Sequence, residues 1–133
     1  MNARLLISVV VFALSMQLTA CARNQVSFSA DVQPILQDSC LECHNGSGEG
    51  LAASGFSVVS YADVMKGTAL GPVVVAGSSM SSALYLVVAG KTAPEIRMPP
   101  HHDESFAEGR GVQLSARQIE IIANWIDQGA KDN

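Results

Sequence analysis

The most constraining feature of the chain is the pentapeptide Cys40-Leu41-Glu42-Cys43-His44. Its pattern, Cys-x-x-Cys-His, is the attachment sequence of c-type haem. Two thiols with this spacing lie on one turn of chain, so each can add to a vinyl group of the same porphyrin. The histidine that follows is then carried under the ring, where its imidazole can bind the iron. The pattern predicts one covalent haem c, held by Cys40 and Cys43, with His44 as an axial iron ligand.

Three other roles are open to the same two cysteines. A thioredoxin-type redox pair is expected in a βαβ context, and the sequence shows no such pattern. A structural zinc ion needs four ligands, but the chain has no second cysteine pair, and only His101 and His102 remain to complete the set. A structural disulfide across so short a loop adds little stability by the loop-entropy argument. Covalent haem is therefore the favoured interpretation, and it requires export, because bacteria attach c-type haem outside the cytoplasm.

The first twenty residues predict an export signal rather than part of the fold. They carry one positive charge, at Arg4, followed by an apolar run over residues 5–14 that is too short to span a bilayer. The segment ends Leu18-Thr19-Ala20-Cys21, which resembles the lipobox of bacterial lipoproteins. We therefore predict a lipoprotein signal peptide over residues 1–20 and lipidation of Cys21.

Ordinary signal peptidase, cutting near Ala20 and Ala22, is the alternative, and it would release the protein without an anchor. Neither interpretation leaves a transmembrane helix. Three cysteines are an awkward number for an exported protein built on disulfides. The count is explained if Cys21 carries lipid while Cys40 and Cys43 hold haem. We expect the protein on the periplasmic side or the outer cell surface, tethered to the membrane through Cys21.

The charge of the mature chain bears on its partners. Loss of residues 1–20 removes Arg4 and no acidic residue, so seven Lys and Arg remain against twelve Asp and Glu, for a formal charge of −5. No basic patch suggests nucleic acid or an anionic surface. The acidic balance favours a partner with a basic docking face. A mildly acidic surface also serves solubility alone, and that interpretation stays open.

The start of the mature chain predicts a helix that leads into the haem motif. Residues 21–27 are short and polar, and we expect them to tether the anchored cysteine to a domain over residues 28–130. Asp31 is the expected N-cap of the first helix, which places Pro34 in the first turn, where its missing N–H costs nothing. The Gly-rich residues 45–50 predict a flexible turn. They lack the Walker spacing and its lysine, so we reject a phosphate-binding loop.

The rest of the chain predicts short helices and one strong helix at the end. The strong helix is expected over residues 117–128, with capping-box spacing between Ser115 and Gln118. Shorter elements are expected as helices over 61–66 and 83–88 and as an extended segment over 70–76. A domain of about a hundred residues buries only a modest core. A buried porphyrin would add apolar bulk, so we expect the haem-containing form to be the stable one.

Several short motifs occur together over most of residues 28–130. They are Phe28-x-x-Asp31-Val32-x-Pro34-Ile35-Leu36, Cys40-x-x-Cys43-His44, Ser60-Tyr61, Ser82-x-Leu84-Tyr85, Met98-Pro99 and Trp125-Ile126-Asp127-Gln128-Gly129-Ala130. In combination they resemble the small single-haem cytochrome c domains of the planctomycete type. The resemblance implies an all-α, class I cytochrome c-like fold in which the first and last helices cross and pack. It also implies His44 as the proximal iron ligand and Met98 as the distal one.

The residues around Met98 leave a choice of distal ligand. Pro99 and Pro100 fix the backbone and prevent a helix, so the Met98 thioether can reach an iron with little ordering cost. His101 and His102 follow closely and carry nitrogen ligands that compete for the same position. With a protein ligand on both faces the iron has no open position. We therefore expect an electron carrier, not an enzyme, with redox proteins as donor and acceptor and no nucleic-acid partner.

Two other functions stay open at this point. A five-coordinate haem c, with His101 or His102 as distal acid–base groups, would act as a peroxidase or would bind NO or O₂. Rapid carbon monoxide binding to the reduced protein would favour that alternative. The other is a lipoprotein domain without haem. A haem stain of the denatured protein distinguishes it from the electron carrier and from the peroxidase or gas binder.

Overall fold

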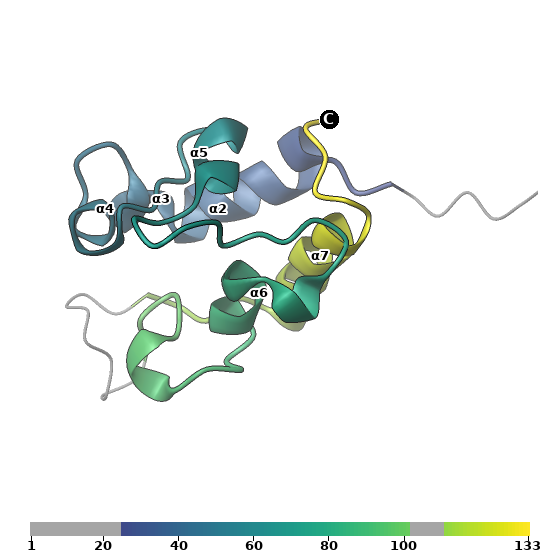
Figure 1. The fold of residues 1–133 in the computed structure, drawn as a ribbon. Helices are drawn as coiled ribbons and strands as arrows, with labels where there is room; N and C mark the ends of the chain where they lie inside the picture. The colour runs from purple at the N-terminus through teal and green to yellow at the C-terminus, as the bar shows by residue number, and fades with distance from the viewer. Residues whose placement is uncertain (1–24, 102–110) are drawn as a thin grey trace, which may run out of the picture.

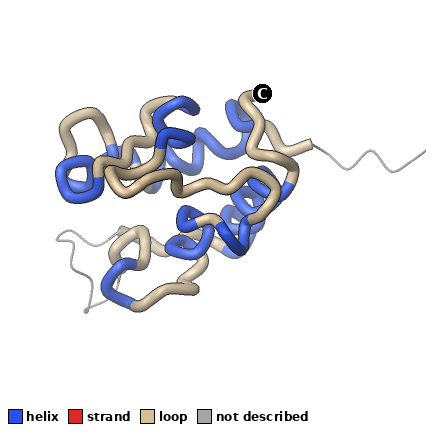
Figure 2. Tube along the Cα trace, viewed as in Figure 1, coloured by secondary structure: helices blue, strands red, loops and turns tan. Residues whose placement is uncertain are grey.

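The computed structural model describes residues 25–101 and 111–133, and these residues form an all-α fold (Figures 1 and 2). In chain order the elements are a π-helical turn η1 (Phe28–Val32), α2 (Gln33–Ser39), α3 (Leu41–His44), α4 (Glu49–Ser54), α5 (Tyr61–Lys66), a 3₁₀ turn η2 (Ser79–Ser81), α6 (Ala83–Val88), a 3₁₀ turn η3 (Pro94–Ile96) and α7 (Ala116–Asp127). Within the described ranges there is no strand, only an isolated bridge between Thr68 and Gly71. The predicted fold class is confirmed.

The first helix begins earlier than predicted. Ser27 is the N-cap of η1, and its hydroxyl accepts a hydrogen bond from the Ala30 N–H at 3.1 Å. The carboxylate of Asp31 accepts one in return from the Ser27 N–H at 2.8 Å. This reciprocal pattern resembles a capping box. The prediction of Asp31 as the N-cap is therefore wrong, because Asp31 lies within the first turn and its carboxylate accepts from the N–H of the N-cap residue, Ser27. Pro34 lies at the start of α2, in the first turn that directly follows η1.

The first and last helices pack against each other through aromatic side chains. The ring of Phe28 on η1 lies 5.4 Å from that of Trp125 on α7, measured between centroids. Tyr61 of α5 meets the Phe28 ring edge-on at 5.2 Å, and its hydroxyl donates to the Ala130 carbonyl at 2.8 Å. Such pairs contribute about 0.5–1.5 kcal/mol each beyond the area they bury. This aromatic cluster of Phe28, Tyr61 and Trp125 fixes both ends of the domain to α5.

The final helix follows its sequence signals closely. The Ser115 hydroxyl accepts from the Gln118 N–H at 3.3 Å, and the Gln118 side chain accepts from the Ser115 N–H at 2.9 Å, so the predicted capping box is present. Ile122, Trp125 and Ile126 form the buried face of α7. The predicted helix over 117–128 is observed one residue earlier at each end.

The middle of the chain agrees with prediction in part. The helices α5 and α6 have the predicted bounds, and Ser60 caps α5 by accepting from the Asp63 N–H. Residues 70–76, predicted as an extended segment, contain neither a helix nor a strand. The Gly-rich segment 45–50 is not a flexible turn throughout, because its last two residues begin α4. No residue of α4 is buried, so its sequence shows no apolar stripe and gives no helical signal.

The helices are arranged on two sides of the molecule (Figure 1). One side holds α2, α3, α4 and α5, the other holds α6 and η3, and α7 lies against both η1 and α6 at one end. The haem motif and Met98 therefore come from opposite sides. Within the described part of the chain, no helix has both the length and the apolar character that a bilayer crossing requires.

Candidate cofactor site

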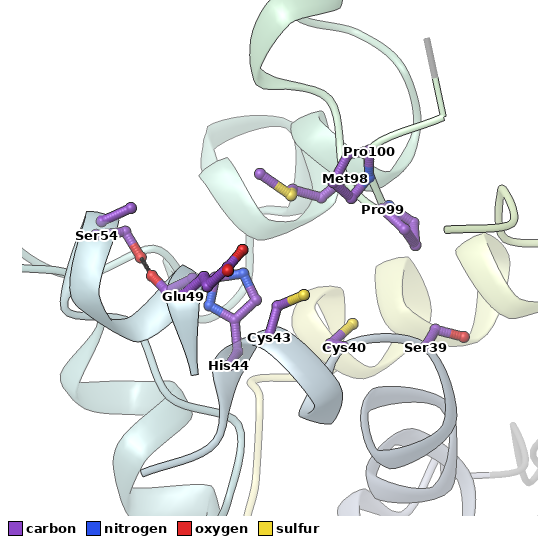
Figure 3. A pocket seen from close by; sticks show the side chains of 11 residues that line it. Ser39, Cys40, Cys43, His44, Glu49, Ser54, Met98, Pro99 and Pro100 are labelled. Atoms are coloured by element: carbon purple, nitrogen blue, oxygen red, sulfur yellow. Dashed lines mark hydrogen bonds between the residues drawn. The ribbon is translucent and has the colours of Figure 1, made fainter. Parts of the chain in front are cut away.

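The two predicted attachment cysteines lie where α2 passes into α3. Cys40 ends α2, with its N–H bonded to the Leu36 carbonyl at 2.9 Å, and it is also the N-cap of α3. The His44 N–H bonds back to the Cys40 carbonyl at 2.9 Å, which closes one helical turn. Figure 3 shows the consequence: both thiols and the imidazole project from this turn toward the same space. Neither cysteine forms a disulfide.

That space consists of two neighbouring cavities. The larger, of about 410 Å³, is bordered by Cys40, Cys43, His44, the start of α4 and residues 98–100. The smaller, of about 190 Å³, is lined mainly by apolar side chains; they include Phe56, Val73, Leu84, Val87, Val88 and Ile96. Cys40, His44, Ser54 and Met98 border both cavities. The larger volume alone lies in the range of about 300–1,000 Å³ that is usual for cofactor sites.

The orientation of the His44 imidazole leaves one ring nitrogen available. Its Nδ1 lies 3.0 Å from the carbonyl oxygen of Phe56. A carbonyl only accepts, so Nδ1 carries the proton and Nε2 keeps its lone pair. Metal-bound histidines commonly have such a partner on the second nitrogen, which fixes the tautomer and raises the basicity of the ligand. The ring of Phe56 supports the imidazole, with the two centroids 5.4 Å apart.

The thiol of Cys40 is held in its neutral form. Burial, with a smaller effect from Cys43, raises its pKa from 9.0 to about 11. A thioredoxin-type nucleophile requires the opposite, a pKa lowered toward neutrality so that the thiolate is present. The environment of Cys40 therefore does not suit a redox disulfide. It is compatible with addition of an S–H group to a vinyl carbon.

Met98 lies across the cavity from His44 (Figure 3). Its N–H donates to the Val87 carbonyl at 3.2 Å, which ties its backbone to α6, and Pro99 and Pro100, which follow, are buried. The thioether is thus carried on a segment that is anchored on both sides of the residue.

The other candidate residues are placed less favourably or lie outside the described residues. Met65 packs against the core and Met80 is 62% exposed, so neither borders these cavities. The Nδ1 of His101 is bonded to the Pro99 carbonyl, and His101 borders neither cavity. His102 and Cys21 lie outside the described residues.

The residues present fit a covalently attached haem. Two thiols face one apolar-lined cavity, an imidazole with a free Nε2 lies beside them, and a thioether lies opposite. Sequence analysis did not identify Phe56 and α4 as parts of this site. The contribution of Phe56 is largely that of a backbone carbonyl, which leaves no trace in the residue type.

Residues 40–102 match the model of a protein family described as planctomycete cytochrome C. No curated protein and no solved structure matches the chain. The matched range contains both cysteines, His44 and Met98, and it therefore covers the residues around the cavities.

Proposed function

Because the chain contains a small c-type cytochrome domain, matched over residues 40–102 by the planctomycete cytochrome C family, we propose that it transfers single electrons through one haem c with His44 and Met98 as axial ligands. Cys40 and Cys43 would hold the porphyrin through thioethers. The observation that supports the proposal is that these four side chains border one cavity (Figure 3). The haem, when bound, supplies an iron that alternates between the ferric and ferrous states.

The protein's own groups set the conditions for that electron transfer. A methionine ligand favours the ferrous state and raises the potential. The hydrogen bond from His44 Nδ1 to Phe56 acts in the opposite direction, because it makes the imidazole a stronger donor to ferric iron. Apolar side chains of α6 line the smaller cavity, so a porphyrin bound there would have a hydrophobic environment. If His44 and Met98 both bind the iron, no position would remain on it for a substrate, which favours a carrier over a peroxidase.

The proposal is tested by optical spectroscopy of protein matured in a host with haem-attachment machinery. We expect haem that is retained after denaturation, and a weak sulfur-to-iron charge-transfer band in the oxidised state. Carbon monoxide should bind the reduced protein slowly and incompletely. Fast, complete binding would overturn the six-coordinate assignment and favour the peroxidase or gas-binding alternative.

The partners we propose are redox proteins that present a basic face. From residue 24 to residue 65 the chain has no Lys or Arg, and its acidic residues there are Asp31, Asp38, Glu42, Glu49 and Asp63. These five carboxylates carry a formal charge of −5, which is as large as the net charge of the whole mature chain. Glu42 and Glu49 are exposed, and Glu49 borders the larger cavity. A partner approaching the attachment turn would therefore meet negative charge, which favours complementary basic side chains.

For localisation we propose export, with Cys21 as the lipidated first residue of the mature protein. The support is the signal-like segment over residues 1–20 and its lipobox-like end. Attachment of c-type haem outside the cytoplasm agrees with this route. The anchor would keep the domain at a membrane surface, where electron donors and acceptors are within reach of a short tether.

A further inference from the structure

The Gly-rich segment after His44 has no role in the function proposed so far. It contains Gly46, Gly48 and Gly50 at alternate positions. None of these three has a positive φ angle. Conformational freedom is therefore not the reason for glycine here, since every residue type can adopt such backbone angles. The remaining reason for a glycine is close approach of another group to its Cα.

Two of the three glycines lie against the candidate cofactor site. A Cβ placed on Gly50 would lie 2.6 Å from Cε1 of His44 and 2.8 Å from each ring nitrogen. Because the nitrogens are hardly farther from this Cβ position than Cε1 is, the position lies over the face of the imidazole and not beyond its Cε1 edge. A Cβ on Gly48 would overlap the Cys43 carbonyl. Carbon atoms in contact normally lie about 3.5–4.0 Å apart, so a methyl group fits at neither position.

The third glycine differs from the other two. A Cβ on Gly46 would have no atom within 4 Å, and the residue is exposed. The segment therefore contains its own control position. Alanine at Gly46 changes the loop composition without contact, whereas alanine at Gly50 meets the imidazole.

The structure holds Gly50 in place against the ring. The Ser54 hydroxyl donates to the Gly50 carbonyl at 2.6 Å across the single turn of α4 (Figure 3). The end of α4 is tied to the next loop, since the Ala69 N–H bonds to the Ser54 carbonyl at 2.9 Å. The Val58 N–H returns to the His44 carbonyl at 2.9 Å. Residues 44–58 thus form a closed loop around the imidazole.

We propose that Gly50 is a positioning residue for the His44 imidazole, and that α4 forms to carry it. The inference rests on the proposed function, in which His44 binds the haem iron. Gly50 blocks rotation of the ring on one face, while the Phe56 carbonyl fixes Nδ1 at 3.0 Å. A side chain at position 50 must either turn the imidazole or displace α4. In both cases the Nδ1–carbonyl bond lengthens and the imidazole becomes a weaker donor.

The test compares Gly50→Ala with Gly46→Ala in the full-length, haem-containing protein. We expect Gly50→Ala to keep its covalent haem, because both thiols are unchanged. Its potential should rise, since a weaker imidazole stabilises ferric iron less, and the g-values of the oxidised protein in electron paramagnetic resonance should shift. Gly46→Ala should match the wild type in both. These readouts report the ligand itself, and a purely structural role of Gly50 would move only the melting temperature.

The inference is overturned if Gly50→Ala has the same potential and g-values as Gly46→Ala. If Gly50→Ala fails to fold, Ser54→Ala decides instead. That change introduces no clash and removes both hydrogen bonds of the Ser54 hydroxyl, the one to the Gly50 carbonyl and the one from the Phe56 N–H at 3.2 Å. Because both bonds hold the loop around the imidazole, a smaller shift in the same direction is expected, and no shift refutes the inference. A wild-type protein without haem would refute the proposed function itself, and the two failures are thereby distinguished.

Discussion

Replacement of Met98 by alanine tests the proposed axial ligand most directly. The Met98 backbone is held by the Val87 carbonyl on one side and by buried prolines on the other, so the chain has little freedom to supply a new ligand. His101 is not an easy substitute, because it borders neither cavity. We therefore expect Met98→Ala to leave the iron with an open or water-filled position.

The size of the effect follows from the preference of a thioether for ferrous iron. Each tenfold decrease in the ratio of ferrous to ferric binding constants of the ligand lowers a one-electron potential by about 59 mV. We therefore expect the potential to fall by that amount or more. The charge-transfer band of the oxidised protein should disappear, and carbon monoxide should bind the reduced protein rapidly. Met80→Ala is the matched control, because Met80 is 62% exposed and borders neither of the two cavities at the site. A Met98→Ala protein that keeps the wild-type spectrum and potential would refute the assignment, and a wild-type spectrum of bis-histidine type would refute it earlier.

Three further predictions concern attachment, anchoring and docking. Changing Cys40 or Cys43 to alanine should weaken or abolish covalent haem retention, and a fully haem-free chain should lack a cooperative thermal transition; a sharp, native-like transition without haem would contradict this. Cys21→Ala should move the protein from the membrane to the soluble fraction or block its processing, and an intact mass of the wild type showing an unmodified N-terminus would rule out the anchor. Glu42→Lys should slow electron transfer to a basic partner at low salt by more than Glu120→Lys, a matched charge change on α7; equal effects would exclude docking at the attachment turn.

Local signals predicted the elements whose caps are made by side chains. Ser60 and the Ser115–Gln118 pair gave the starts of α5 and α7 because a hydroxyl that accepts from a backbone N–H must lie at a fixed offset from the helix. The start of the first helix was predicted too late because two side chains, four residues apart, both form capping hydrogen bonds there. Ser27 and Asp31 both take part in the cap, and either can be read as its first residue.

The candidate site was predictable only where it uses side chains. Cys40, Cys43, His44 and Met98 were identified by residue type, and the structure brings them to one cavity. The partner of His44 is a carbonyl, and α4 meets the imidazole with a glycine backbone. Neither depends on a side chain, so neither leaves a periodic or compositional signal. Glycines that serve close approach also look the same in sequence as glycines that serve a flexible turn.

The division of the core explains why ligand binding and folding should be coupled in this domain. At the α7 end, Phe28, Tyr61 and Trp125 pack directly on one another, and no cofactor is needed there. At the other end, the attachment turn and Met98 face each other across a cavity, and protein side chains do not fill it. A cofactor bound by the attachment turn on one side and by Met98 on the other would connect the two sides of the molecule at the end where no protein core connects them. Without them, the aromatic end should retain more order than the cavity end, so hydrogen exchange in haem-free protein should be slower in α7 than in α3 and α4.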